Sequence, residues 1–108
     1  PMVKVTFIAH DGTATTLEGV VGDSVMSLAT AEGLDGILGD CGGSMMCATC
    51  HCYVDESWAD KTGERVAGEE DMLESAACEA TDFSRLSCQI KLTEDIDGLI
   101  VRLPEEQI

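Results

Sequence analysis

The residues most suited to chemistry in this sequence are its six cysteines, four of which have a spacing that suits a metal centre. Five residues separate Cys41 from Cys47, two separate Cys47 from Cys50, and thirty-seven separate Cys50 from Cys88. Three thiolates on one short stretch reach a common centre only if the chain curls around it. The fourth thiolate then comes from a distant segment and ties the curled stretch to the rest of the fold.

The stretch around the first three cysteines has the composition that such a curl needs. Gly39, Gly42 and Gly43 permit unusual backbone angles and a close approach of the chain to the centre. A loop bent in this way points its N–H groups inward, where they and the hydroxyls of Ser44 and Thr49 can donate to sulfur. Such donors raise the reduction potential of an iron–sulfur centre. We therefore predict cofactor contacts at Gly42, Gly43, Ser44 and Thr49.

A zinc site is the main alternative, because two residues between Cys47 and Cys50 also suit zinc and dithiol redox sites. Zinc ribbons, however, carry two such closely spaced pairs, and Cys78 and Cys88 are too far apart to form the second one. A triplet of neighbouring thiolates with one distant cysteine is more specific to a [2Fe–2S] cluster. We predict this cluster on Cys41, Cys47, Cys50 and Cys88, and keep a structural zinc-binding interaction module as an alternative.

Cys52 and Cys78 remain outside this set. Cys52 lies two residues after Cys50, so a regular strand would place both side chains on the same face. It is an alternative ligand, but we expect a small buried side chain. Cys78 lies near the end of an expected helix and is expected to pack.

The charge of the chain limits its partners. It carries 21 acidic and 6 basic residues, for a formal net charge of −15. A field of this sign steers a protein toward basic partners, and it disfavours nucleic acid and anionic membrane surfaces. No apolar run has the length of a membrane span, and no signal segment is visible. Six cysteines without a secretion signal indicate a reducing compartment.

The pattern of the chain predicts one domain over residues 1–108 with an α+β fold. Hydrophobic residues make up 44% of the sequence, enough for a core. A helix is expected after Asp23 or Ser24, with Gly33 as its stop. Asp11-Gly12 predicts a tight turn in a β-hairpin. Expected strands cover residues 3–8, 13–20, 51–54, 86–92 and 99–103, with a helical turn at 57–61 and a short helix at 69–77.

The expected helix at 69–77 has an acidic face. Its apolar residues fit one side, and its acidic residues lie mostly on the other: Met72, Leu73, Ala76 and Ala77 against Glu69, Glu70, Asp71 and Glu74. Glu70 and Glu74 are four residues apart, a like-charge spacing that destabilises a helix by a few tenths of a kcal/mol. This cost favours a surface for a partner over a face that is only solvated.

Five short segments, in order along nearly the whole chain, together point to one family. They are Gly39-Asp40-Cys41-Gly42-Gly43-Ser44, Cys47-Ala48-Thr49-Cys50-His51, Asp71-Met72-Leu73-Glu74, Ser84-Arg85-Leu86-Ser87-Cys88-Gln89 and Asp97-Gly98-Leu99-Ile100-Val101. They resemble the adrenodoxin/putidaredoxin family of [2Fe–2S] ferredoxins. Plant-type ferredoxins have four residues in the first gap between cysteines, whereas this chain has five.

This resemblance implies a β-grasp fold and an electron-transfer protein rather than an enzyme. Its expected partners are an FAD-containing ferredoxin reductase, as the electron donor, and a cytochrome P-450 monooxygenase, as the acceptor. The resemblance also implies a monomer that forms transient complexes in the bacterial cytoplasm, with the mitochondrial matrix as the alternative location. Partner-binding acids are expected at Asp40, Asp71 and Glu74.

The resemblance further implies a polar network of His51, Glu69 and Arg85 between the cluster loop and the acidic helix. One hypothesis is that this network relays the redox state to the docking surface, and the alternative is that it only holds the loop. A donor for iron–sulfur cluster assembly is the alternative function, because Cys50-His51-Cys52 resembles that branch of the family.

Overall fold

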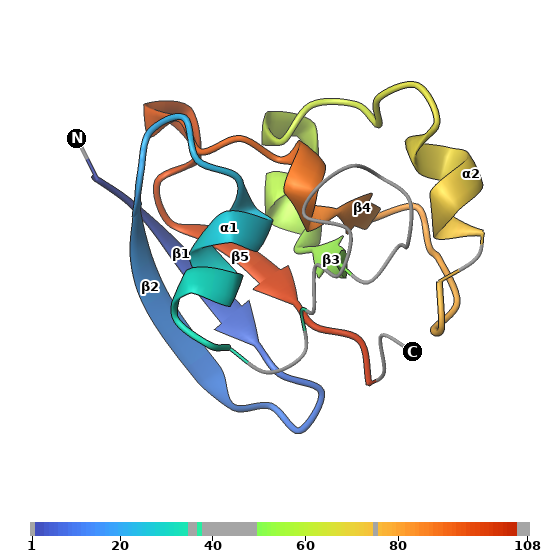
Figure 1. The fold of residues 1–108 in the computed structure, drawn as a ribbon, viewed down its shortest axis with the longest axis horizontal. Helices are drawn as coiled ribbons and strands as arrows, with labels where there is room; N and C mark the ends of the chain where they lie inside the picture. Colours follow the sequence, from blue (N-terminus) through green and yellow to red (C-terminus); the bar gives the residue numbers. More distant parts are fainter. Residues whose placement is uncertain (1, 35–36, 38–49, 75, 106–108) are drawn as a thin grey trace.

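The computed structural model describes residues 2–34, 37, 50–74 and 76–105. Its centre is a five-stranded mixed sheet with the strand order β2-β1-β5-β3-β4 (Figure 1). The strands are β1 (Met2–Ile8), β2 (Ala14–Val20), β3 (His51–Val54), β4 (Ser84–Leu86) and β5 (Leu99–Arg102). The helical elements are α1 (Val25–Ala31), α2 (Glu69–Leu73) and the 3-10 turns η1 (Glu56–Lys61), η2 (Ser87–Gln89) and η3 (Glu94–Ile96).

The first two strands form the predicted β-hairpin. Met2 pairs with Val20 and Ile8 pairs with Ala14 in an antiparallel register. The connection closes through a bond from the N–H of Ala9 to the carbonyl of Thr13, at 2.8 Å. Gly12 has a φ of 93°, which glycine adopts without steric cost, so the Asp11-Gly12 signal did mark the turn.

The last strand lies between the first and the third. β5 pairs in parallel with β1 and antiparallel with β3, and β3 pairs antiparallel with β4. The N-terminal and C-terminal strands are therefore neighbours at the middle of the sheet. This order, with short helices between the strands, confirms the expected α+β architecture of the β-grasp kind.

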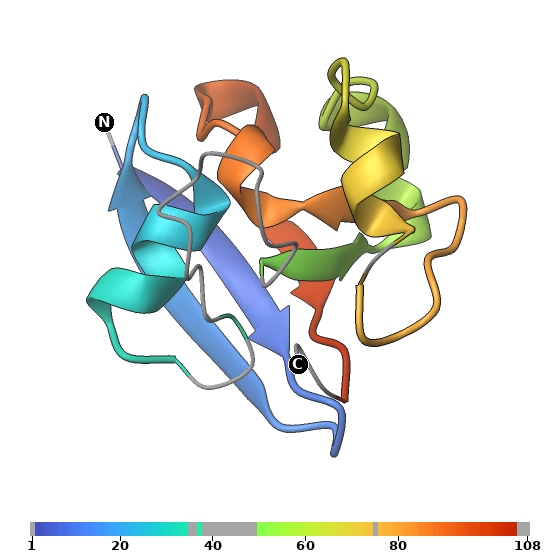
Figure 2. The ribbon, with the colours of Figure 1, turned by 45° about the vertical axis from the view of Figure 1, so that its right-hand side comes forward.

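Helix α1 supplies one side of the core, as predicted. Ser24 caps it by accepting a hydrogen bond from the N–H of Ser27, and Gly33 follows its end with a φ of 67°. Its buried residues are Val25, Met26, Leu28 and Ala29. They belong to the same core cluster as the buried side chains of β1, which are Val3, Val5 and Phe7. Burying each large apolar side chain contributes about 1.5–3 kcal/mol. Figure 2 shows α1 against β1 and β2, with α2 and η1 at the other end of the molecule.

The predicted strand over 86–92 is wrong beyond its first residue. β4 ends at Leu86, and the 3-10 turn η2 follows at once. Alternate residues are all buried, which imitates the period of a strand: Leu86, Cys88, Ile90 and Leu92. After η2 the backbone bonds to the segment before α1, with the N–H of Leu92 donating to the carbonyl of Asp23 at 2.7 Å.

The predicted helix over 69–77 is shorter than expected, because α2 ends at Leu73. The N–H of Ala76 bonds to the carbonyl of Leu73 in a tight turn, and Ala77 is exposed. The small residues after Glu74 offer little apolar surface to bury, so packing contributes little to extending the helix past Leu73.

Candidate metal centre

Two of the four predicted ligands lie among the described residues, and the fold brings them together. Cys50 directly precedes β3 and Cys88 lies in η2, with the two sulfur atoms 3.4 Å apart. Both side chains are buried, and the N–H of Ser87 donates to the carbonyl of Cys50 at 2.9 Å. The residue that precedes β3 is therefore tied directly to the turn that carries the second cysteine.

The remaining residues of the predicted loop site lie outside the described residues. They are Asp40, Cys41, Gly42, Gly43, Ser44, Cys47 and Thr49. Their roles as ligands, cofactor contacts and partner contact stay predictions.

The electrostatics of the described cysteine pair suit a cationic centre. The hydrogen bond with Cys88 and burial raise the pKa of the Cys50 thiol. Burial also raises the pKa of Cys52 to about 12. Buried thiolates are thus unfavourable on their own, whereas a coordinating metal favours the deprotonated sulfur. Two buried sulfurs at contact distance are a donor set that fits a [2Fe–2S] cluster.

Gln89 is a site residue that the sequence reasoning missed. Its side-chain Nε2 donates to the sulfur of Cys88 at 3.2 Å. A donor at this place favours the negatively charged sulfur. Its signals in the sequence are that Gln89 immediately follows a predicted ligand and ends one of the segments that resemble the family.

The two remaining cysteines differ in burial. Cys52 is fully buried in β3 and pairs across the sheet with Arg85, which confirms the expectation of a small buried side chain. Cys78 is half-buried and lines a hollow of about 470 Å³, together with Tyr53 and Leu103.

Glu69 and Arg85 form the centre of a buried polar network, and the part of the expected network that includes His51 and the cluster loop stays a prediction. Glu69 is fully buried rather than on the polar face of α2 with Glu70. Its carboxylate accepts hydrogen bonds from Arg85 Nε at 2.7 Å and from the N–H groups of Val66 and Leu86 at 3.0 and 2.9 Å. Arg85 also donates to the carbonyls of residues 62 and 63. The network therefore holds α2, β4 and the loop after η1 together.

His51 is fully buried at the start of β3, one residue after Cys50. Its Nε2 shares a 2.8 Å hydrogen bond with the hydroxyl of Ser84, which also accepts from the N–H of Thr81. Burial, and then the charge of Arg65, lower the pKa of His51 to about 4, so the ring is neutral at pH 7.

Arg65 is a second residue that the sequence reasoning missed. Its guanidinium donates to the carbonyls of Ser84 at 3.0 Å and Thr81 at 2.6 Å, and it lies 3.4 Å from the carboxylate of Glu70. Arg65 therefore connects helix α2 to the segment from Thr81 to Ser84, and Ser84 is the hydrogen-bond partner of His51.

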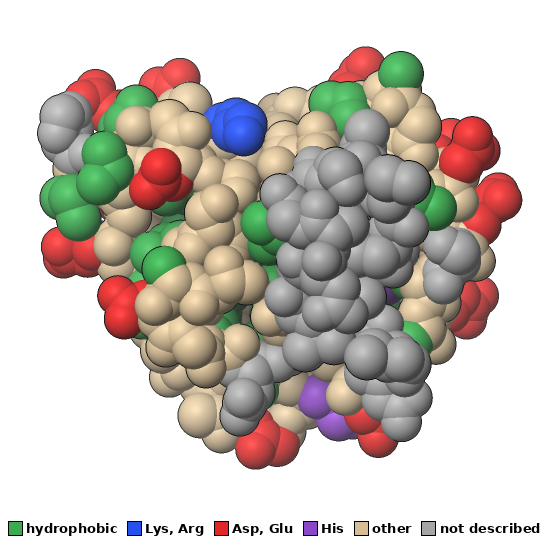
Figure 3. Space-filling model, in the orientation of Figure 1, with side chains coloured by type: hydrophobic (Ala, Val, Ile, Leu, Met, Phe, Trp, Pro, Cys, Tyr) green, Lys and Arg blue, Asp and Glu red, His purple; other side chains and the backbone are tan. Residues whose placement is uncertain are grey.

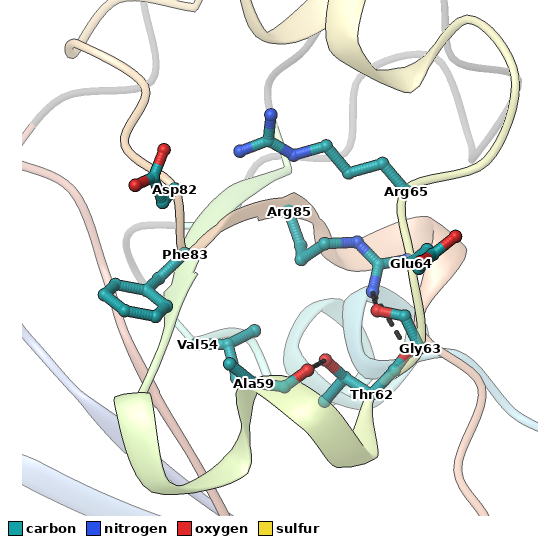
Figure 4. Close-up of a pocket in the computed structure, with 9 residues that line it drawn as sticks. All are labelled: Val54, Ala59, Thr62, Gly63, Glu64, Arg65, Asp82, Phe83 and Arg85. Atoms are coloured by element: carbon teal, nitrogen blue, oxygen red, sulfur yellow. Dashed lines mark hydrogen bonds between the residues drawn. The ribbon is translucent and has the colours of Figure 1, made fainter.

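Figure 4 shows both arginines at the edge of a surface hollow of about 380 Å³. Val54, Ala59 and Phe83 supply its apolar lining, and the described residues that line it include no cysteine. This hollow thus lies beside the polar network and is separate from the cysteine pair.

Acidic side chains gather along the edge of the molecule that carries α2 (Figure 3). Glu70, Asp71 and Glu74 are all exposed there. The structure thus leaves Asp71 and Glu74 accessible, and their role in partner binding stays a prediction. Among the described residues, no helix has the length and apolar character needed to cross a membrane.

Comparison with known proteins defines the class. The family described as "2Fe-2S iron-sulfur cluster binding domain" matches residues 8–93. This chain belongs to that family, and within it to the adrenodoxin-type ferredoxins, which are electron carriers and not enzymes.

Two relatives are similar over nearly their whole length. Rhodocoxin from Rhodococcus erythropolis is 49% identical over 107 residues, which cover 99% of this chain and 100% of rhodocoxin. A crystal structure of reduced, singly substituted putidaredoxin from Pseudomonas putida has a TM-score of 0.95 at 45% identity, covering 97% of this chain and 99% of that one. Putidaredoxin in a covalent complex with putidaredoxin reductase has a TM-score of 0.90 at 46% identity, covering 94% and 97%.

The cofactor of this chain is therefore a [2Fe–2S] cluster, and its function is electron transfer. The zinc-binding alternative is wrong, because the family model that matches most of the chain is one that binds iron and sulfide.

Proposed function

We propose that Cys41, Cys47, Cys50 and Cys88 are the four ligands of the cluster. The proximity of the Cys50 and Cys88 sulfurs, at 3.4 Å, supports half of this set. The glycine-rich stretch between residues 39 and 43 supports the other half, since a curled loop needs it. When bound, a [2Fe–2S] cluster takes up and releases one electron at a time.

We further propose that this chain carries electrons from an FAD-containing ferredoxin reductase to a cytochrome P-450 monooxygenase. The observation that carries the proposal is the similarity, over nearly the full chain, to a putidaredoxin that has been captured in a covalent complex with its reductase. The cysteine loop and the acidic helix resemble those of the adrenodoxin/putidaredoxin family, and this resemblance supports a cytochrome P-450 monooxygenase as the electron acceptor.

In this proposal the polypeptide shields the cluster from water and presents a surface that binds the redox partners. Its buried cysteine pair and the core around Cys88 keep water from the metal centre, and Gln89 stabilises negative charge on sulfur. Its exposed acids on α2, Asp71 and Glu74, together with Asp40, attract a basic face on each partner. We propose a monomer in the bacterial cytoplasm that binds its partners transiently, which suits a carrier that must leave one to meet the other.

Reduction by purified putidaredoxin reductase tests the first half of the path. Holoprotein mixed anaerobically with NADH and this reductase should lose visible absorbance to the same extent as holoprotein treated with dithionite. The substitutions Asp71→Asn and Glu74→Gln should each raise the KM for the carrier several-fold at low salt and leave kcat nearly unchanged. Glu18→Gln removes one exposed charge from β2 and serves as the matched control. Equal effects of all three substitutions would contradict a docking role for α2.

Cluster assembly remains a second candidate function, and Cys50-His51-Cys52 is the feature that favours it. The structure shows Cys52 fully buried, so this cysteine is not displayed to a partner in the folded chain. Cells that lack the gene separate the two functions, because loss of an assembly donor would lower iron–sulfur enzyme activity broadly.

A further inference from the structure

Ser87 has a buried hydroxyl that differs from the other buried serine hydroxyls in its hydrogen bonding. Three serines are buried among the described residues: Ser24, Ser84 and Ser87. The hydroxyls of Ser24 and Ser84 are hydrogen-bonded, to Ser27 and to His51. The hydroxyl of Ser87, by contrast, has no hydrogen-bond partner among the described protein atoms, although the residue is fully buried.

A buried hydroxyl without a partner is costly, because it has lost its bonds to water and gained none. Alanine would fill almost the same space without that cost. Such an orphaned group in a folded protein therefore indicates a partner other than the described protein atoms, and a bound cofactor is one such partner.

The position of Ser87 shows what that partner is. Ser87 immediately precedes Cys88, and its N–H donates to the carbonyl of Cys50 at 2.9 Å. Ser87 is thus next in the chain to one of the two described cysteines and is hydrogen-bonded through its backbone to the other. On the other side of Cys88, Gln89 already donates to the ligand sulfur. No described protein atom, the sulfurs of Cys50 and Cys88 included, accepts from the Ser87 hydroxyl, and a cluster held by these two cysteines would bring further sulfur acceptors to this place.

We propose that the hydroxyl of Ser87 donates a hydrogen bond to a sulfur of the bound [2Fe–2S] cluster. This inference rests on the proposed ligation by Cys50 and Cys88. A reduced cluster is more negative than an oxidised one, so a donor to its sulfur stabilises the reduced state more strongly and raises the reduction potential. Ser87 is thus a tuning residue that touches the cofactor, in addition to the loop donors expected at Ser44 and Thr49.

The test is the reduction potential of Ser87→Ala holoprotein. We expect the ratio of oxidised to reduced protein at a fixed potential to rise about tenfold, which equals a potential lower by about 59 mV for one electron. The iron–sulfur stretching frequencies should also respond less to exchange of H₂O for D₂O than those of the parent. Ser24→Ala is the matched control: it removes the cap of α1 and should lower stability without changing the potential.

Two results would overturn the proposal. One is an unchanged potential with a higher resistance to denaturant, which would mean that the hydroxyl is only an unsatisfied group or is bonded to a buried water. The other is loss of iron and sulfide in both Ser87→Ala and Ser87→Thr. If only the Ser87→Ala variant fails to bind the cluster, the Ser87→Thr variant, which keeps the hydroxyl, should have the reduction potential of the parent. A lower potential in Ser87→Thr would contradict the proposal.

The reduction potential is measured on the isolated holoprotein, so the result does not depend on which proteins are its redox partners. A failure of the proposed ligand set would show separately, as iron content that is unaffected by Cys88→Ala.

Discussion

Arg85 and Glu69 form an ion pair inside the protein, with Arg85 Nε donating to Glu69 Oε2 at 2.7 Å and both side chains almost completely buried. The pair connects β4 to the start of α2, and Glu69 accepts two further bonds from backbone N–H groups. Removing one charge of a buried pair leaves the other without compensation. The position of the acidic helix thus depends on this contact.

Replacement of Glu69 measures that dependence. Glu69→Gln should reduce the free energy of unfolding of the holoprotein by about 3–5 kcal/mol, measured by anaerobic denaturant titration. Glu70→Gln breaks only the exposed pair with Arg65 and should cost less than about 1 kcal/mol. Similar costs for the two variants would contradict the importance of the buried pair.

The same Glu69→Gln variant tests the relay hypothesis for His51, Glu69 and Arg85. Reductase affinity is measured for the oxidised and the reduced carrier. A relay predicts that the substitution changes the ratio of the two affinities. Equal changes in both redox states would show that the network only holds the loop.

Arg65 should hold the segment before β4 in place. Arg65→Met removes its bonds to the carbonyls of Thr81 and Ser84, and we expect a loss of about 1–2 kcal/mol of stability. Amide hydrogen exchange should accelerate over residues 81–84, where the N–H of Ser84 bonds to Thr81. Lys61→Met, which removes an equal charge above the ring of Trp58, is the control. Unchanged exchange at 81–84 in the Arg65 variant would refute the assignment.

Asp55 should make stability depend on pH. Hydrogen bonds from Ser57 and then Arg102 lower its pKa from 3.8 to about 2. The folded state therefore binds the proton less readily than the unfolded state. The contribution of Asp55 is complete above pH 3.8 and is lost as the pH falls to about 2.

Comparison of the parent with Asp55→Asn checks this dependence. The variant should be less stable than the parent at pH 7, and the difference in unfolding free energy should shrink as the pH falls through that window. Glu18→Gln, in an exposed acid on β2, controls for the change in net charge. A difference that is constant from pH 7 to pH 2 would count against the Asp55 contacts.

The ligand assignment predicts opposite results at two buried cysteines. Cys88→Ala should abolish assembly of the [2Fe–2S] cluster, because it removes a ligand. Cys52→Ala should retain iron, sulfide and the electron paramagnetic resonance signal of the reduced state, and should cost about 1 kcal/mol in packing. Loss of the signal in the Cys52 variant would make Cys52 a ligand and the proposed set incorrect.

Much of the fold follows from local patterns in the sequence. The β3 bounds at His51 and Val54 and the hairpin around Gly12 are as predicted, and the cap of α1 at Ser24 is one of the two predicted positions. Each depends on residues close together in the chain. The strand predicted over 86–92 was wrong for a physical reason. Alternate residues are buried there although the chain turns through η2, and the backbone of Ile90 and Leu92 bonds to Val25 and Asp23 instead of to a strand.

The sequence predicts the site residues that follow from the spacing of the cysteines. It does not predict those that depend on contacts between distant segments. The meeting of Cys50 and Cys88 follows from the motif. The contacts of Arg65 with a segment sixteen residues or more away, and the orphaned hydroxyl of Ser87, depend on tertiary structure and have no periodic signal.

The most direct test of the proposed role uses host cells that lack the gene for this chain. Two activities are measured side by side: a general iron–sulfur enzyme, and whole-cell hydroxylation of candidate apolar substrates. A dedicated carrier to a cytochrome P-450 monooxygenase predicts that one hydroxylation disappears while the iron–sulfur enzyme stays fully active. A broad fall in iron–sulfur enzyme activity would contradict that role and favour a donor for cluster assembly.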